Sequence, residues 1–205
     1  FVALVPLLLA CRGLGARAGF ALGGAFGALS SLAIYHWLRE VPAIGAPQMA
    51  LLAAYVSLYP ALWCAALPLL RRGRLPLVLS APALWVALDA LKANAGFLAL
   101  PWATLAHSQH ENIALLQLAA LAGEAGVSFV VVMVNVALAQ GLAARRVTRG
   151  AVVTGVLVAA CHGAGALRLA APESGPRLTL AAVQPALGVG ARNTSAAREA
   201  AWHTL

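Results

Sequence analysis

The chain has 205 residues, of which 62% are hydrophobic and 10% are charged, and its mean hydropathy is +0.86. A soluble domain has roughly 25% charged residues, so the composition excludes that class and indicates a membrane protein with several spans. The net charge of +8 does not indicate nucleic-acid binding, because the charges lie at the ends of apolar stretches and form no basic face. We assign them to membrane topology and anionic lipid headgroups.

Apolar stretches follow one another along most of the chain, separated by short polar breaks. Residues 1–10 are too short to span a membrane and are expected to be the end of a truncated span. Because about 20 apolar residues are needed to cross the hydrocarbon, five further spans are expected: 18–38, 47–70, 75–90, 118–139 and 151–167, the third and fifth near the lower limit. The sequence therefore predicts an all-α polytopic membrane helix bundle of about six spans over residues 1–169.

Along the chain, polar breaks that are rich in basic residues alternate with polar breaks of mixed charge. Eight of the 14 Lys and Arg residues form three runs, Arg12/Arg17, Arg71/Arg72/Arg74 and Arg145/Arg146/Arg149. The other breaks, at 39–40 and 92–111, hold one basic residue each and, with Asp89 and Glu124 at their edges, four of the six acidic residues. Short loops rich in Lys and Arg stay in the cytoplasm. The three basic runs are thus predicted to lie inside, and the residues after about 168 outside.

The chain changes character after the last apolar stretch. Residues 171–176, Ala-Pro-Glu-Ser-Gly-Pro, form a turn-rich linker. The apolar run at 178–183 is typical of a buried strand, although a short helix would look alike. The polar residues 193–195 are expected to cap a helix over 196–202. Residues 170–205 are therefore predicted to be a linker and the start of a second, truncated domain.

Five short sequence segments, taken in chain order, carry a family resemblance. They are LLAAYVSLYPALW from residue 51, APALWVALDALKA at 81–93, LPWATLAHSQ at 100–109, QLAALAGEAGVSFVVVMVNVALA at 117–139 and LTLAAVQPALG at 178–188. In this order they resemble the bacterial apolipoprotein N-acyltransferases, whose membrane bundle precedes an outward-facing α/β domain of the nitrilase, or carbon-nitrogen hydrolase, superfamily. Asp89 and Lys92 replace the family's usual Glu and Arg, and residues 186–188 depart from its usual Asn-Ile-Pro.

The resemblance implies a reaction, partners and a location. An acyl chain passes from membrane phospholipid to a cysteine thiolate, and then to the α-amino group of a diacylglyceryl apolipoprotein, in the bacterial cytoplasmic (inner) membrane. The family's catalytic Cys, Glu and Lys lie downstream of the five matched segments. We therefore expect no catalytic residue in this chain, no activity from it alone, and no cofactor or metal. Cys11, Cys64 and Cys161 lie in apolar surroundings and are expected to be small buried hydrophobes.

Six polar or aromatic residues near the predicted outer face are the candidate site. Trp102 is either an interfacial anchor or a guide for lipid, and Ser108 and Gln109 belong either to a solvated loop or to the same guiding segment. Glu124, near the outer start of its span, is either functional or simply stabilised by the helix dipole. Asp89 and Lys92 share a helix face and are expected to pair structurally.

Two other functions remain open at this point. A small polytopic transporter is disfavoured, because no internal repeat occurs and the charges cluster at the boundaries of the spans, whereas transport sites usually place them near the midplane. A non-catalytic relative of the family, which keeps the bundle but lacks the catalytic cysteine, is compatible with this sequence.

Overall fold

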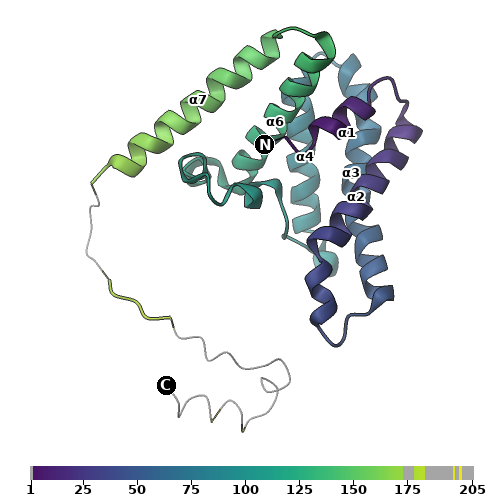
Figure 1. The fold of residues 1–205 in the computed structure, drawn as a ribbon, viewed down its shortest axis with the longest axis vertical. Coiled ribbons are helices and arrows are strands. Elements are labelled where there is room, and N and C mark those ends of the chain that lie inside the picture. The colour runs from purple at the N-terminus through teal and green to yellow at the C-terminus, as the bar shows by residue number, and fades with distance from the viewer. Residues whose placement is uncertain (1, 173–177, 183–195, 197–198, 200–205) are drawn as a thin grey trace.

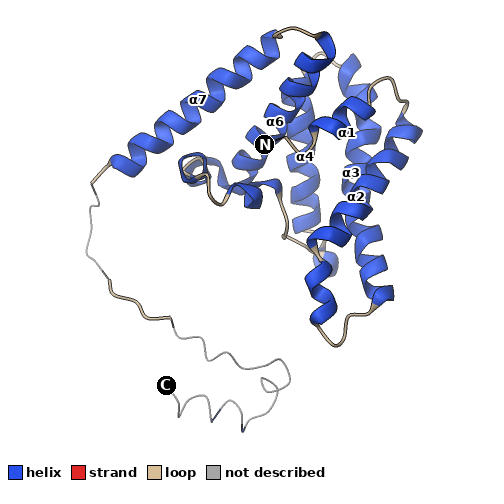
Figure 2. Ribbon diagram, in the orientation of Figure 1, coloured by secondary structure: helices blue, strands red, loops and turns tan. Residues whose placement is uncertain are grey.

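Every regular element that the structure describes is helical (Figures 1 and 2). The computed structural model describes residues 2–172, 178–182, 196 and 199. Its long helices are α2 (Ala16–Ile34), α3 (Ala46–Arg72), α4 (Leu77–Ala93), α6 (Ala119–Ala144) and α7 (Arg149–Ala170). Shorter ones are α1 (Val5–Ala10), α5 (Ile113–Leu116) and the 3-10 helices η1 (His36–Glu40), η2 (Gly96–Leu98) and η3 (Leu105–Gln109). The expected all-α class is confirmed for the described residues up to 172.

Four of these helices, α2, α3, α6 and α7, are long and apolar enough to cross a membrane. With 17 residues, α4 is about 25 Å long at ~1.5 Å per residue, close to the lower limit for a span. Many large apolar side chains on the four helices point outward, among them Leu29, Leu51 and Leu157. Such a surface suits a lipid environment, and the chain is a multi-pass membrane protein.

Two predicted helix boundaries among the five expected spans differ from the observed ones by four or five residues, and the others by at most three. The stretch expected at 18–38 ends as an α-helix at Ile34, because the following residues tighten into η1. The stretch expected at 118–139 continues to Ala144, since apolar and small residues keep helical conformation until Arg145 adopts a left-handed one. Both differences lie at helix ends, where hydrophobicity alone marks a boundary poorly.

Helices α2 and α3 form a close pair through small residues. The buried residues of α2 recur every fourth position: Gly19, Gly23, Gly27 and Ser31. A Cβ atom added at Gly23 would overlap the Pro60 carbonyl oxygen of α3. In a membrane, helix association depends on close van der Waals packing, which small residues permit. The repeat therefore sets the approach of these two helices, which run side by side in Figure 1.

The core lies where α6 packs against α1 and α4. Trp63 of α3 is fully buried, donates its indole N–H to the Ala81 carbonyl oxygen at 2.8 Å, and stands edge-on to Trp85 at 5.0 Å between ring centroids. On α6, the buried Asn135 accepts a hydrogen bond from the Leu4 backbone N–H at 2.8 Å. Buried polar groups need such partners, and these two bonds fasten α3 to α4 and the chain start to α6.

The two ends of the bundle differ in charge. At what we call the basic end, the connections between α1 and α2, α3 and α4, and α6 and α7 come together, since Arg12, Arg71 and Arg149 line one cavity there. The opposite, mixed-charge end consists of η1 and residues 89–124. Helix α7 ends beside it, because Gly165 packs against the Ala114 carbonyl group. Figure 1 shows α7 leaning away from the other long helices along most of its length.

The predicted strand near the end of the chain is not observed where the structure describes it. Residues 178–182 have no regular secondary structure. A strand is stabilised by hydrogen bonds to a neighbouring strand, and no strand occurs in the described part of the chain. Residue 183, and the expected helix over 196–202 apart from residues 196 and 199, lie outside the described residues.

Candidate functional site at the mixed-charge end

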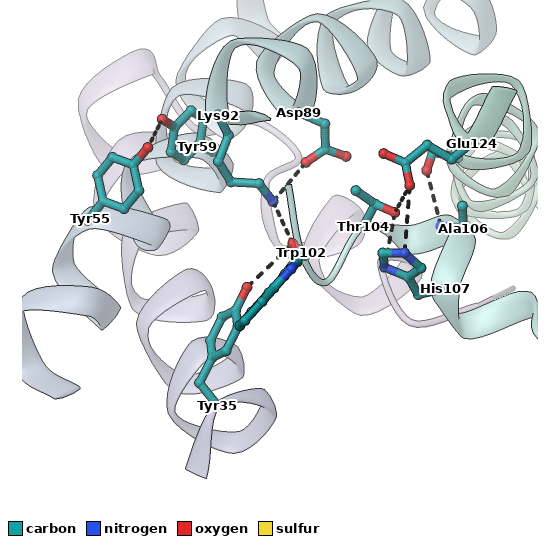
Figure 3. A network of polar contacts seen from close by, with 11 residues as sticks. Tyr35, Tyr55, Tyr59, Asp89, Lys92, Trp102, Thr104, Ala106, His107 and Glu124 are labelled. Carbon is teal, nitrogen blue, oxygen red and sulfur yellow. Dashed lines mark hydrogen bonds and ion pairs between the residues drawn. The ribbon is translucent and has the colours of Figure 1, made fainter. Parts of the chain in front are cut away.

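The backbone at Trp102 is held from two helices (Figure 3). Its carbonyl oxygen accepts a hydrogen bond from Lys92 Nζ, near the end of α4, and another from the Tyr35 hydroxyl, just after α2, each at 3.4 Å. The next residue, Ala103, has φ +56°. This left-handed conformation costs an L-residue roughly 1–2 kcal/mol. The surrounding contacts therefore hold a strained turn in place, which fixes the position of the Trp102 backbone.

The Trp102 indole lies at the surface. It is 52% exposed, and its ring centroid is 6.3 Å from that of Trp37 in η1, with the planes tilted by 36°. Tryptophan pairs of this kind suit the membrane–water interface, where an apolar ring and a polar N–H are both accommodated. The geometry is compatible with both roles considered for Trp102, anchor and guide.

Asp89 and Lys92 form a buried ion pair directly behind this turn. Lys92 Nζ lies 3.2 Å from Asp89 Oδ1, and the two side chains are 6% and 17% exposed, respectively. The other carboxylate oxygen, Asp89 Oδ2, and the indole nitrogen of Trp85 are buried without a hydrogen-bond partner among the described residues. Two buried charges are tolerated because each compensates the other.

Glu124 belongs to a second polar cluster, which includes η3. Thr104 Oγ1 donates to Glu124 Oε2 at 3.3 Å, and His107 Nε2 lies 3.7 Å from the same oxygen. Thr104 Oγ1 is also 3.4 Å from His107 Nδ1 (Figure 3). The Glu124 and His107 side chains are both about half exposed. The cluster therefore joins α6 to the connecting segment at a position open to solvent.

A backbone break places Glu124. Gly123 has φ +61° and ψ −168° inside α6, a combination that is essentially restricted to glycine. One turn later, Ser128 Oγ accepts a hydrogen bond from the Ala106 N–H at 3.1 Å. The break and this bond together hold η3 against the start of α6.

Ser108 and Gln109 lie apart from both clusters. The Ser108 hydroxyl is exposed and donates to the Leu105 carbonyl oxygen at 2.7 Å. Gln109 is 6% exposed and donates its Nε2–H to Ser108 Oγ at 2.9 Å. These contacts are local to η3. The structure thus brings Trp102 together with Asp89 and Lys92, and places Ser108 and Gln109 elsewhere on the same segment.

Two cavities adjoin the polar clusters, and Asp89 lines both. One has a volume of about 220 Å³ and is mainly apolar, with Phe26, Tyr59, Trp85 and Leu105 among its lining and Tyr35, Asp89 and Lys92 at its polar part. The second, of about 210 Å³, is lined by residues that include Asn94, Thr104, Glu124 and Ser128. An apolar cavity with a few polar groups is typical of a site for an amphiphilic molecule.

None of the three cysteines lines either cavity. Cys11 and Cys64 are buried in the core and Cys161 is partly buried on α7. Within the described residues, no group of three or more His, Cys, Asp and Glu side chains could hold a metal ion. The arrangement can bind and orient an amphiphile, and it offers no thiol at that position.

Sequence reasoning missed Tyr35 and Thr104 as members of the site. Tyr35 is 3% exposed, and its hydroxyl reaches residue 102 across 67 positions of the chain. No spacing rule links such positions. Thr104 lies in the segment LPWATLAHSQ, close to Trp102 and Ser108, which were selected as candidate site residues. Its position in that segment was the available signal.

Comparison with known proteins gives consistent matches. The model of the apolipoprotein N-acyltransferase N-terminal domain matches residues 1–137. A protein of Geobacter metallireducens named apolipoprotein N-acyltransferase is 32% identical over 204 residues, covering 90% of this chain and 38% of the relative. One of the same name from Rhodopirellula baltica is 34% identical over 159 residues, covering 69% of this chain and 27% of the relative. The chain therefore spans well under half the length of either relative.

Proposed function

The chain belongs to the apolipoprotein N-acyltransferase family, and from this premise we propose that it is the membrane portion of an enzyme that acylates the N-terminus of lipoproteins. The acyl donor is a membrane phospholipid and the acceptor is a diacylglyceryl-cysteine. The names of the two relatives and the multi-pass bundle support the proposal. In this proposal the mixed-charge end faces outward from the bacterial inner membrane, following the distribution of basic residues.

The proposed reaction has two steps. A cysteine thiolate attacks the acyl ester of the phospholipid, a thioester forms, and a lysophospholipid leaves with its alkoxide protonated. The acceptor amine then attacks the thioester, loses a proton and releases the thiol. Such chemistry needs an activated thiol, a general base and a donor to the oxyanion. We assign these groups to a nitrilase-like domain that follows the bundle, in the length of the relatives not matched by this chain.

The bundle's own contribution, in this proposal, is to position lipid. The observation that carries this role is the fixed turn at Trp102. Lys92 and Tyr35 hold its carbonyl oxygen, its indole remains half exposed, and the neighbouring Ala103 lines the 220 Å³ apolar cavity. An aromatic side chain on a fixed turn that adjoins an apolar cavity can direct an acyl chain toward an adjoining active site.

Trp102→Ala, made in the complete open reading frame, tests this role. We expect thioester formation per folded molecule to slow on the order of a hundredfold, since small displacements of a reacting group have effects of that size. The measurement is the single-turnover rate of acyl-enzyme formation from a phospholipid donor, divided by the amount of folded protein in detergent.

Phe97→Ala is the matched control, because Phe97 is an aromatic side chain of the same segment that is 97% exposed. It should leave the rate per folded molecule unchanged. An unchanged rate for Trp102→Ala, with less protein in the membrane, would make Trp102 an anchor and end its guiding role. Absence of any thioester in the unmodified protein would overturn the proposed function itself and favour a non-catalytic relative.

A further inference from the structure

A further cavity lies at the basic end, away from the lipid-guiding site. Its volume is about 500 Å³, within the roughly 300–1,000 Å³ typical of ligand sites. Helices α1, α3, α4, α6 and α7 all contribute to its wall. Its lining is Leu8, Arg12, Arg71, Leu77, Val136, Ala139, Gln140, Ala143, Ala144, Thr148, Arg149 and Gly150. Part of this lining is aliphatic, and three of its residues are arginines.

The positive charge in this cavity has no acidic counterpart among the residues that line it. The five helices that line the cavity contain two acidic residues, Asp89 in α4 and Glu124 in α6, and both lie at the opposite, mixed-charge end. Among the described residues, no ion pair involves Arg12, Arg71 or Arg149. Arg71 donates one hydrogen bond to the Cys11 carbonyl oxygen at 3.0 Å, which orients the side chain and leaves its charge uncompensated.

The start of α7 adds further donors. Thr148 caps this helix by accepting a hydrogen bond from the Ala151 N–H at 3.1 Å. Thr148, Arg149 and Gly150 all line the cavity. The N-terminus of a helix of 22 residues carries a partial positive charge of about half a unit. It therefore reinforces the potential that the three arginines create.

We propose that this cavity binds the phosphate headgroup of an anionic phospholipid, with an acyl chain along its aliphatic wall. Guanidinium groups bind phosphate oxygens through short, charge-assisted hydrogen bonds. Basic pockets between transmembrane helices bind such headgroups. The wall of Leu8, Leu77 and Val136 suits a lipid better than a free phosphate. The site is separate from the acyl-donor role proposed for the other end and does not depend on it.

The test measures lipid binding directly. The full-length protein in a mild detergent is titrated with phosphatidylglycerol, with phosphatidylcholine or with inorganic phosphate, and bound lipid is counted by native mass spectrometry. The variant is Arg12→Gln with Arg149→Gln. Its matched control is Arg145→Gln with Arg146→Gln, which removes the same charge from the same end without touching the cavity wall.

We expect unmodified protein to retain phosphatidylglycerol in preference to phosphatidylcholine. The Arg12/Arg149 variant should bind it at least tenfold more weakly, and the Arg145/Arg146 control should bind it as before. Equal weakening in both variants would reduce the effect to overall charge and overturn the site. Displacement of the lipid by inorganic phosphate at similar concentration, or equal binding of phosphatidylcholine, would also overturn the proposal.

Discussion

The two ends of the bundle handle charge in opposite ways. At the mixed-charge end, Asp89 pairs with Lys92 at 3.2 Å and Glu124 lies 3.7 Å from the His107 ring. At the basic end, Arg12, Arg71 and Arg149 surround a cavity and no acidic residue is near in the sequence. The charges of Asp89 and Lys92 compensate each other within the protein, and Lys92 also holds the turn at residue 102. Charges that are not compensated are free to act on the membrane.

Positive φ angles occur at both ends of the bundle, at Gly13 and Arg145 in the basic end and at Gly96, Ala103 and Gly123 in the mixed-charge end. Those at Ala103 and Gly123 lie next to residues of the candidate site. Strain of this kind persists only where the surrounding contacts enforce it. Substitutions at the mixed-charge end should therefore affect stability strongly, and those at the basic end only weakly.

The largest effect is expected from Lys92→Met. This change removes the cation and leaves the Asp89 carboxylate buried. Breaking a buried ion pair in this way costs about 3–5 kcal/mol of unfolding free energy. The measurement is the unfolding free energy in mixed micelles, followed as the denaturing detergent fraction rises.

The double variant Asp89→Asn with Lys92→Met separates pairing from packing. Because it leaves no buried charge, it should recover most of the stability lost in the single variant. If the single and double variants unfold alike, the pair contributes nothing specific. The two ends would then not differ as we argue.

A smaller effect is expected from Gly123→Ala. No atom lies within 4 Å of an added Cβ there, so the substitution tests backbone conformation alone. At φ +61° and ψ −168° the substitution should lower the unfolding free energy by about 1–3 kcal/mol.

Gly163→Ala is the control, since it also has open space around the new atom but lies within α7. It should be neutral or stabilise by up to about 1 kcal/mol. An equal response at both sites would contradict the assigned strain.

Much of the helix bundle could be predicted from the sequence, because the length of an apolar stretch and the charges at its two ends are local properties of the chain. The gathering of Arg12, Arg71 and Arg149 around one cavity fits the alternation of basic and mixed breaks. Helix ends were predicted less well, since the change at Ile34 from α2 to η1 alters hydrogen bonding without altering hydrophobicity.

The candidate site was predicted only where its contacts are local. Asp89 and Lys92 lie one turn apart, and the structure places them together. The Tyr35 contact with Trp102 depends on how α2 packs beside residues 99–104, which no sequence pattern specifies. The burial of Gln109 likewise depends on the folding of η3 against α6, and its polar character alone suggested exposure.

The smallest effect, and one of opposite sign, is expected from Arg145→Gly at the basic end. Arg145 ends α6 with φ +50° and ψ +34°, and its N–H donates to the Gly141 and Leu142 carbonyl oxygens. Glycine avoids the roughly 1–2 kcal/mol cost of this conformation. It also loses more conformational entropy on folding, which lowers the unfolding free energy by roughly 0.5–1 kcal/mol. The net gain in unfolding free energy should be about 0.5 kcal/mol, which raises the thermal unfolding midpoint by about 1–2 °C.

Arg146→Gly is the control, because it removes the same charge at a residue that has no left-handed conformation to relieve. It should not raise the midpoint. If both variants lowered the midpoint equally, the arginines would stabilise the fold through their charge, and the basic end would resemble the mixed-charge end in this respect.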